Sequence, residues 1–576
     1  TSGAGADTLT TGVEKSNYSA GSGNDTIIFT TAGLTSVDTV AGGDGTDILQ
    51  ISNASTIVDS DFTNITSVET INNGTTNAAQ TITLGSLADA TGIATITGNG
   101  TGIDTVTVGA GFDNDLTIAL AKGNDIIKGS ASAAALTVTA GTALNINAAD
   151  EIRGGTGSSD SIKITADNDT TTGAVFGESV TGIETVTIVA STTNDAKLTT
   201  HNDNVTDTTG SLTVDASALT SSLAAFVFIS QEDSTATINV TSGAGADTLT
   251  TGVEKSNYSA GSGNDTVVFT TAGLTSVDTV AGGDGTDILQ ISDASTIVDS
   301  DFTNITTVET INNATTNAAQ TITLGSLADA TGIATITGNG SGADTVTVGA
   351  GFDNDLTIDI ANSSTVAGND NIDASASAST ITITSSLTGI TADDTIKGGT
   401  GSSDTIKITA DNDVSTGAIF GANVTGFENV TIVASTTKDA MLTTHNDNLT
   451  DSDTLTVDAS ALTSSLAAFV FVSSESTAEN GVTINVTGGD GGNTLTLGTE
   501  KSNYTGGDLA DTFKVATANL TSVDTLAGGS GTDVLQLTAA STIVDADFTN
   551  VTALESITNA TTNAAQTITL GSLADA

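Results

Sequence analysis

The sequence contains no cysteine, no proline and no tryptophan, and only 12 of its 576 residues are lysine or arginine. Without cysteine, the chain forms no disulfide, no cysteine-ligated zinc site and no iron–sulfur cluster, and it has no cysteine nucleophile. With aromatic residues at 3%, a carbohydrate site built on stacked tryptophans is not expected. The absence of proline indicates that backbone N–H groups are needed almost everywhere, as in continuous hydrogen-bonded ladders.

Acidic residues dominate the charge, with 67 aspartates and glutamates and a formal net charge of −55. That sign argues against nucleic acid as a partner, because phosphate binding needs clustered cations, and against anionic membrane surfaces. No apolar run approaches the roughly 18 residues that span a bilayer, so membrane insertion is not expected. A compact chain this acidic repels itself and needs bound cations or screening salt.

A long tandem repeat organises the chain. The string TSGAGADTLTTGVEKSNYSAGSGNDT begins at Thr1, recurs almost unchanged at Thr241, and has a diverged copy from Thr487. We therefore divide the chain into repeat units 1–240, 241–486 and 487–576, the last of them truncated. Because nothing near Thr1 resembles a signal peptide and the third repeat stops partway, we expect a segment of a longer array.

Short β-like strings recur about every 10 to 20 residues and are separated by clusters of Gly, Asn, Asp and Ser, which favour turns. Examples are DTIIFT (25–30), DILQIS (47–52) and DTVTV (104–108). Many short strands fit a parallel β-solenoid or a string of tandem β-sandwich domains. We predict an all-β fold, a parallel β-solenoid, because the pattern continues without linkers. Residues 85–91 and 215–226 are candidates for short helical turns, and the second segment fits a loop equally well.

The candidate functional residues of the sequence lie in Gly-Asp turns. The string GGDGTDILQ occupies 42–50 and 282–290, and GGSGTDVLQ occupies 528–536. Glycines let the chain turn tightly with carbonyls pointing inward, and the aspartate adds a carboxylate just before a strand. Such oxygens suit Ca²⁺, which takes 6–8 oxygen ligands in flexible geometry. The candidate calcium ligands are Gly42, Gly43, Gly45, Asp47, Gly282, Gly283, Gly285, Asp287, Gly528, Gly529, Gly531 and Asp533.

Looser versions of the same turn add further candidate calcium ligands, namely Asp7, Asp25, Asp104, Asp247, Asp265, Asp344 and Asp511. The 18 residues from Asp7 to Asp25 match a coil made of two nine-residue motifs, whereas the 22 residues from Asp25 to Asp47 are expected to break that register. The competing interpretation is an ordinary solvated turn, since Gly and Asp are favoured there in any case.

The pattern G-G-x-G-x-D-x-U-x, with U a large apolar residue, resembles the calcium-binding repeats of RTX proteins. Recurring phrases such as DFTNITSVETI (61–71), DFTNITTVETI (301–311) and VTGIETVTIVAST (180–192) resemble bacterial S-layer and related secreted surface-fibre proteins. This resemblance implies a β-solenoid, calcium-driven assembly and export by a type I system.

Other chemistry finds little support. His201 and His445 sit in matching LTTHNDN strings and are expected to be surface turn residues. The sequence has no H-E-x-x-H zinc motif and no G-x-S-x-G elbow.

We predict a non-enzymatic, extracellular, self-assembling structural protein of the bacterial cell surface, an S-layer or surface filament stabilised by Ca²⁺. Its expected partner is itself, stacked head to tail through unpaired strand edges, with any cell-surface glycan anchor outside this segment. The alternatives are an adhesin stalk and the calcium-binding repeat tail of a secreted enzyme.

Overall fold

The computed structural model describes the chain except for a set of short segments. These are residues 13–14, 31–32, 54, 75–78, 99, 190–193, 206–209, 235, 271–272, 293–295, 315–318, 339–342, 361–368, 411–416, 434–437, 451, 476–480, 517–518, 541, 561–564 and 576.

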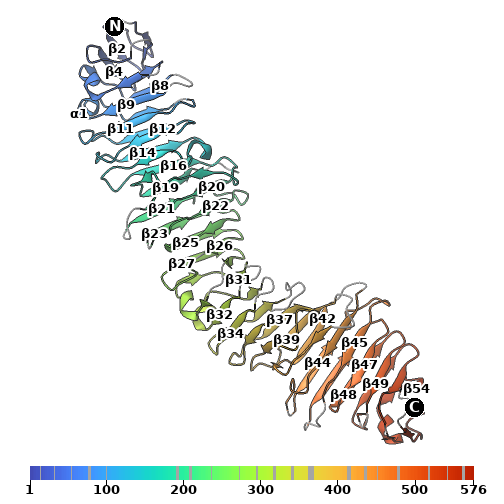
Figure 1. Ribbon diagram of the computed structural model, residues 1–576. Helices are drawn as coiled ribbons and strands as arrows, with labels where there is room; N and C mark the ends of the chain where they lie inside the picture. The colour runs from blue at the N-terminus through green and yellow to red at the C-terminus, as the bar shows by residue number, and fades with distance from the viewer. Residues whose placement is uncertain are drawn as a thin grey trace. The chain divides into compact units, whose positions relative to one another are not determined.

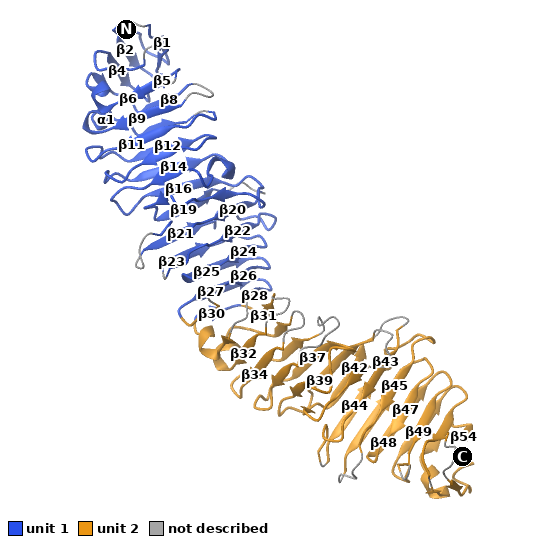
Figure 2. Ribbon diagram, in the orientation of Figure 1, with its two compact units in different colours: residues 1–272, 277–289, 304–307 blue, residues 273–276, 290–303, 308–576 orange. Residues whose placement is uncertain are grey.

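The fold is an all-β parallel solenoid, which confirms the predicted class, and Figure 1 shows its short strands stacked one coil upon the next. The chain forms two compact units, coloured separately in Figure 2. Unit 1 comprises Thr1–Ala272, Val277–Leu289 and Asn304–Thr307, and unit 2 comprises Gly273–Ser276, Gln290–Thr303 and Val308–Ala576. The units and the sequence repeats are different divisions of the chain.

Unit 1 contains a 14-stranded parallel sheet with the order β1 (Thr8–Thr10), β3 (Thr26–Phe29), β5 (Ile48–Ile51), β8 (Thr70–Asn73), β10 (Thr95–Thr97), β12 (Leu116–Leu120), β14 (Leu136–Ala140), β16 (Ser161–Thr165), β19 (Thr185–Val189), β21 (Ser211–Asp215), β23 (Thr237–Thr241), β25 (Lys255–Ser262), β27 (Thr279–Asp284) and β30 (Ile305–Thr306). A six-stranded sheet has the order β18 (Val180–Thr181), β15 (Glu151–Arg153), β13 (Ile126–Lys128), β11 (Thr105–Val108), β9 (Gln80–Leu84) and β6 (Ser55–Ile57). Strands β2 (Asn17–Ser22), β4 (Thr39–Asp44) and β7 (Ile65–Thr66) form a three-stranded sheet. Strands β17 (Ala174–Val175), β20 (Ala196–Thr199), β22 (Phe226–Ile229), β24 (Thr248–Thr250) and β26 (Thr266–Phe269) are consecutive strands of another sheet.

Strand β28 (Ile288–Ile291) is divided between the two units. Unit 2 contains successive neighbours β31 (Thr310–Asn313), β33 (Thr335–Thr337), β35 (Leu356–Asp359), β37 (Ile381–Ser386), β39 (Thr405–Thr409), β42 (Asn429–Val433), β44 (Thr454–Asp458), β46 (Thr483–Thr487), β48 (Lys501–Gly507), β50 (Thr525–Gly529) and β53 (Val551–Thr552). A six-stranded sheet has the order β29 (Thr296–Ile297), β32 (Thr321–Leu324), β34 (Thr345–Val348), β36 (Asn371–Asp373), β38 (Thr395–Lys397) and β41 (Val424–Thr425). A seven-stranded sheet has the order β40 (Ala418–Ile419), β43 (Ala440–Thr443), β45 (Phe469–Val472), β47 (Thr494–Leu497), β49 (Thr512–Val515), β51 (Val534–Leu537) and β54 (Ser556–Asn559). Strands β52 (Thr542–Ile543) and β55 (Thr567–Ile568) form a two-stranded sheet.

Helical structure is confined to single turns. These are α1 (Ser86–Asp89), α2 (Ser326–Asp329), and the 3₁₀ turns η1 (Asp59–Phe62), η2 (Ala143–Asn145), η3 (Asp299–Phe302) and η4 (Asp545–Phe548). The predicted helical turn in residues 85–91 is confirmed by α1, whereas residues 216–225 form a loop with turns between β21 and β22, as the alternative interpretation of that segment expected. Among the described helices, none is long and apolar enough to cross a membrane.

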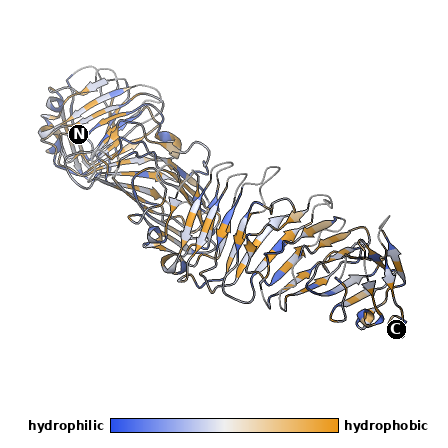
Figure 3. Ribbon diagram, turned by 60° about the horizontal axis from the view of Figure 1, so that its bottom comes forward, coloured by the Kyte–Doolittle hydropathy of each residue, from blue (hydrophilic) through white to orange (hydrophobic). Residues whose placement is uncertain are grey.

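The core lies inside the coils, because strand residues alternate between the interior and the surface. Ile27, Leu49 and Ile71 follow one another in register on β3, β5 and β8, and each is fully buried. Figure 3 shows the resulting alternation of hydrophobic and hydrophilic residues along the strands. Aromatic packing adds to this core in unit 1, where Phe228 meets Tyr258 edge to face at 5.8 Å. Apolar side chains of similar size therefore stack from coil to coil, and this stacking fixes the register of the turns.

Candidate cation-binding site

The turn requires glycine at all three positions of the strict motif, for two different structural reasons. In the first copy, Gly43 and Gly45 have φ angles of +115° and +139°, which favour glycine. Gly42 has no positive φ angle, but a Cβ there would lie 1.9 Å from the carbonyl oxygen of Ser67 and 2.4 Å from Oδ2 of Asp47. The same pattern holds for Gly282, Gly283 and Gly285 and for Gly528, Gly529 and Gly531. The turn therefore brings a carboxylate oxygen and a backbone carbonyl to one crowded point.

Every predicted aspartate stands directly before a strand, as the motif requires. The strands that follow begin at Thr8, Thr26, Ile48, Thr105, Thr248, Thr266, Ile288, Thr345, Thr512 and Val534. The large apolar residues of the strict copies, Leu49, Leu289 and Leu535, are fully buried. These parts of the sequence interpretation are confirmed.

The aspartates of successive coils form a hydrogen-bonded ladder. The backbone N–H of Asp7 donates to Oδ1 of Asp25 (2.7 Å), and that of Asp25 donates to Oδ1 of Asp47 (2.8 Å). The N–H of Asp47 in turn donates to Oε2 of Glu69 (2.8 Å). The expectation that the 22-residue step breaks the register is wrong, because Thr26 pairs with Ile48 in the parallel ladder. The longer coil therefore still places Asp47 beside Asp25 in the ladder.

Two further ladders repeat this arrangement. In unit 1, the N–H of Asp247 donates to Oδ1 of Asp265 and that of Asp265 to Oδ1 of Asp287, both at 2.8 Å. In unit 2, the corresponding donors are Asn493, Asp511 and Asp533, and the acceptors are Oδ1 of Asp511, Oδ1 of Asp533 and Oε2 of Glu555. Carboxylates are thus stacked one per coil, with like charge on neighbouring coils.

Several ladder aspartates bury an oxygen that has no hydrogen-bond partner among the described residues. This atom is Oδ2 in Asp25, Asp47, Asp265, Asp511 and Asp533, and each of these residues is at most 1% exposed. The residue five positions earlier is alanine or glycine in every case and brings no side-chain donor. Asp247 differs, because the hydroxyl of Ser242 donates to its Oδ2. A buried oxygen without a donor is costly, so these positions call for a proton or a cation.

The surroundings of Asn493 show which oxygen atoms of the turn a positively charged group would contact. It occupies the place of Asp247 in the third repeat, where Gly488 also replaces Ser242. Its Nδ2 donates to the carbonyl oxygens of Gly489 (3.0 Å), Gly491 (2.9 Å) and Gly506 (3.1 Å) and to Oδ1 of Asp511 (2.9 Å). Four oxygens therefore converge on one amide NH₂ group, whose hydrogens carry partial positive charge.

The electrostatics of the ladders agree with this geometry. Burial raises the pKa of Asp265 to about 7, and the charges of Asp247 and Asp287 add to the effect. Burial likewise raises the pKa of Asp511 to about 6. In the described part of the chain, the ion pairs of lysine and arginine involve Glu151 and Asp373, and none reaches these ladders. The ladder charge is left for protons or bound cations to neutralise.

The donor set fits a hard cation only if backbone oxygens take part. Within the described residues, no group of three or more His, Cys, Asp or Glu side chains is placed to hold a metal. The orphaned Oδ2 atoms and the converging carbonyls around Asn493 supply the oxygen ligands that Ca²⁺ accepts. Asp7, Asp104 and Asp344 are less buried than the other predicted aspartates.

Sequence reasoning missed several ladder residues. Glu69 and Glu555 end two of the ladders, and the recurring phrase that begins with Asp-Phe-Thr-Asn contains both. Asp125 and Asp370 continue ladders from Asp104 and Asp344, because the N–H of Asp104 donates to Oδ1 of Asp125 (2.9 Å) and that of Asp344 to Oδ1 of Asp370 (3.0 Å). The signal that could have found the glutamates is their position directly before a β-branched strand, the same place that the motif aspartates take.

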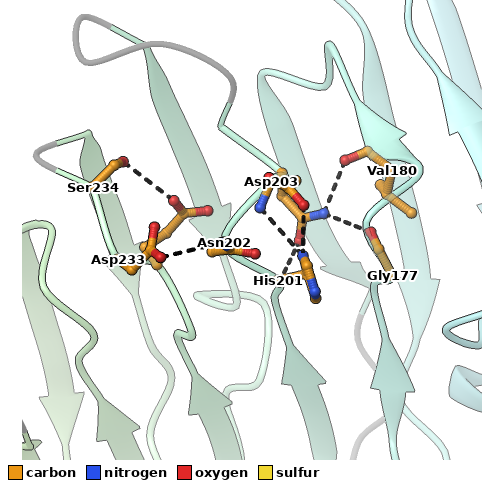
Figure 4. Close-up of polar contacts among 9 residues, drawn as sticks. Gly177, Val180, His201, Asn202, Asp203, Asp233 and Ser234 are labelled. Carbon is orange, nitrogen blue, oxygen red and sulfur yellow. Dashed lines mark hydrogen bonds and ion pairs between the residues drawn. The ribbon is translucent and has the colours of Figure 1, made fainter.

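His201 lies in a partly exposed turn, as predicted, and Figure 4 shows its surroundings. Its Nδ1 lies 3.4 Å from Oδ2 of Asp203. The neighbouring Asn204 is buried and donates from Nδ2 to the carbonyl oxygens of Gly177 and Val180, both at 2.9 Å. His445 repeats the pattern in unit 2, with Asp447 at 3.5 Å. The contacts of Asn204 tie its coil to the previous one.

Comparison of the chain with protein-family models, with curated proteins and with solved structures finds no match, so the interpretation depends on the residues and their geometry.

Proposed function

We propose that this chain is an extracellular structural solenoid whose coils are clamped by Ca²⁺ at the Gly-Asp turns. The observation that carries the proposal is the set of buried aspartate oxygens without donors, Oδ2 of Asp25, Asp47, Asp265, Asp511 and Asp533. Calcium there would neutralise the carboxylates and link each turn to its neighbour. The formal net charge of −55 gives this neutralisation a large effect on compactness.

The same chemistry supports a location outside the cell. Calcium sites in extracellular modules bind in the 10⁻⁴–10⁻³ M range, which suits weak, carbonyl-rich sites. An ion that binds only the folded chain adds about 2.7 kcal/mol of stability at 100 times its dissociation constant. Several such ions would make folding conditional on calcium, so the chain would stay unfolded in the low calcium of the cytoplasm and fold after export.

Self-assembly at the bacterial surface, as an S-layer or filament, is the second part of the proposal. The repeats present the same exposed apolar side chains at corresponding places. Leu223 and Leu466 are 77% and 76% exposed, and Val37, Val277 and Val523 are also exposed. A surface that repeats in this way offers equivalent contacts to further copies of the chain.

A calcium titration from excess chelator at low ionic strength tests both parts. Circular dichroism reports folding, and light scattering reports assembly. The triple variant D47N/D287N/D533N is expected to need more calcium for the same β signal. The matched control D44N/D284N changes exposed aspartates of the same turns, where the third repeat already has Ser530, and is expected to behave as the parent chain.

The outcomes separate the proposal from its alternatives. Full folding in chelator, with no response to calcium, would contradict calcium clamping and leave the turns purely structural. Calcium-dependent folding without scattering would favour a monomeric adhesin stalk or the repeat tail of a secreted enzyme.

A further inference from the structure

Two glutamates are buried where one sequence repeat meets the next. Glu232 belongs to the end of the first repeat, and Glu254, in the string EKSNY (254–258), belongs to the start of the second. They are 1% and 5% exposed. At the next junction, Glu475 and Glu500 occupy the corresponding places and are also buried. Each of these junctions therefore takes one buried carboxyl group from each of the two repeats.

The carboxyl group of Glu254 lies against the backbone of Glu232. The N–H of Val253 donates to the carbonyl oxygen of Glu232 at 2.7 Å, so the two coils are hydrogen-bonded at this point. A Cβ on Gly252 would lie 2.3 Å from that carbonyl oxygen and 2.6 Å from Oε2 of Glu254. The two repeats thus pack their glutamates together with no room for a side chain at Gly252.

Glu254 accepts hydrogen bonds at both of its carboxylate oxygens. Its Oε1 accepts from the hydroxyl of Tyr258 (2.8 Å), and its Oε2 accepts from the N–H of Gly252 (2.9 Å). Burial and the charge of Glu254 hold the pKa of Tyr258 well above its ordinary value, so this hydroxyl remains a donor. At the second junction, the hydroxyl of Tyr504 donates to Oε1 of Glu500 at 2.8 Å in the same way.

Glu232, by contrast, has a carboxylate oxygen without a donor. Its Oε1 is buried and has no hydrogen-bond partner among the described residues. The carboxylate accepts a hydrogen bond from the backbone of Val205, and the hydroxyl of Ser234, labelled in Figure 4, lies 3.5 Å from Oε2. An ionised carboxylate is costly in such a place, so Glu232 favours its protonated form.

The charges around Glu232 act in the same direction. The titratable groups packed around the pair are Glu254, Asp233, Tyr258, Asp278 and, on the preceding coil, His201 with Asp203. Lys255 is exposed, and among the described residues no lysine or arginine forms an ion pair with either glutamate. Burial raises the pKa of Glu232 to about 7, and the charges of Glu254 and Asp233 add to the effect.

We propose that each repeat junction is a proton-dependent joint, in which one proton held by the buried glutamate pair keeps the two coils closed and its loss opens them locally. With both carboxyl groups ionised, two like charges share one buried place, and an opening that hydrates Glu232 relieves their repulsion. This inference goes beyond the proposed function and uses none of the proposed calcium ligands, so either proposal can fail without the other.

The direction of the pH effect follows from proton linkage. The closed junction holds the proton of Glu232 more tightly than the open junction, where the pKa returns to its ordinary value of 4.5. Closure is therefore fully favoured below about pH 4.5 and weakens as the pH rises through 7. The opening constant should rise by up to about tenfold for each pH unit in this range and level off above it.

Hydrogen–deuterium exchange of the whole chain between pH 5 and pH 8, at constant excess calcium and corrected for the intrinsic exchange rate, measures the opening. In the parent chain, protection of the β22 and β24 amides is expected to fall about 40-fold from pH 5 to pH 7. The variant E232Q does not ionise and should abolish this fall, while β45 and β47 in unit 2 keep theirs. E475Q should do the reverse. The control D233N changes the exposed neighbour of Glu232 and should keep the parent profile.

A parent chain whose corrected protection stays constant from pH 5 to pH 8 would overturn the proposal. An E232Q variant that keeps the fall of the parent chain would also overturn it, because another group would then carry the effect. If E232Q loses protection at every pH, E254Q provides the test. Removing the neighbouring charge should move the midpoint of the fall to lower pH, and an unchanged midpoint would refute the coupling of the two glutamates.

Discussion

Replacing Asp265 with asparagine is expected to remove a pH-dependent loss of stability from the protein when calcium is absent. Burial raises the pKa of Asp265 from its ordinary value of 3.8 to about 7. The folded chain therefore holds this proton more tightly than the unfolded chain does. The stabilising contribution is complete below about pH 4 and is lost as the pH rises through 7.

The magnitude follows from the same pKa. A displacement from 3.8 to about 7 corresponds to about 4 kcal/mol, at 1.36 kcal/mol for each pH unit. This is an upper value, because burial also raises the pKa of Asp247 in the same ladder, so the two carboxyl groups share the effect. The asparagine variant does not titrate, and its amide can donate where the carboxylate could not. It should match the parent chain near pH 4 and exceed it near pH 8.

Urea unfolding in chelator between pH 4 and pH 8, followed by circular dichroism, measures the difference. The control D284N changes an exposed aspartate of the same coil stack and should keep the pH dependence of the parent chain. A parent midpoint that stays constant or rises from pH 5 to pH 8 would refute the reasoning. So would a D265N variant whose pH dependence equals that of the parent chain.

Two further predictions concern side-chain packing. Gly42→Ala places a Cβ 1.9 Å from the carbonyl oxygen of Ser67 and should lower the free energy of unfolding by roughly 2 kcal/mol or more, whereas Gly3→Ala meets nothing within 4 Å and should be nearly neutral. Equal unfolding midpoints for these two variants would contradict the crowded turn. Phe228→Ala removes a fully buried ring and should cost about 3–5 kcal/mol, while Leu223→Ala, at a side chain 77% exposed, should change stability by less than about 0.5 kcal/mol. Thermal unfolding measures both, and a larger effect at Leu223 than at Phe228 would show that the core is placed wrongly.

Local sequence was sufficient for the strands and for the turns that precede them. A Gly-rich turn, an aspartate and an alternating apolar strand are encoded within nine residues, so Asp47 and Leu49 take their predicted places without reference to the remainder of the chain. The parallel solenoid followed from the repetition of such short segments without linkers.

The ladders and the buried glutamate pairs depend on which coil lies above which, and the sequence alone does not reveal that. Steps of 18, 21, 22 and 26 residues each return an aspartate to the column of its own ladder, because parallel strand pairing fixes the register while the loops absorb the difference in length. Glu69 and Asp125 therefore looked unremarkable in sequence, yet each accepts the backbone N–H of an aspartate on a neighbouring coil. The sequence by itself determined strand, turn and acidity. Only the stacking of coils decided which carboxylates meet, because burial and neighbouring charge arise between residues far apart along the chain.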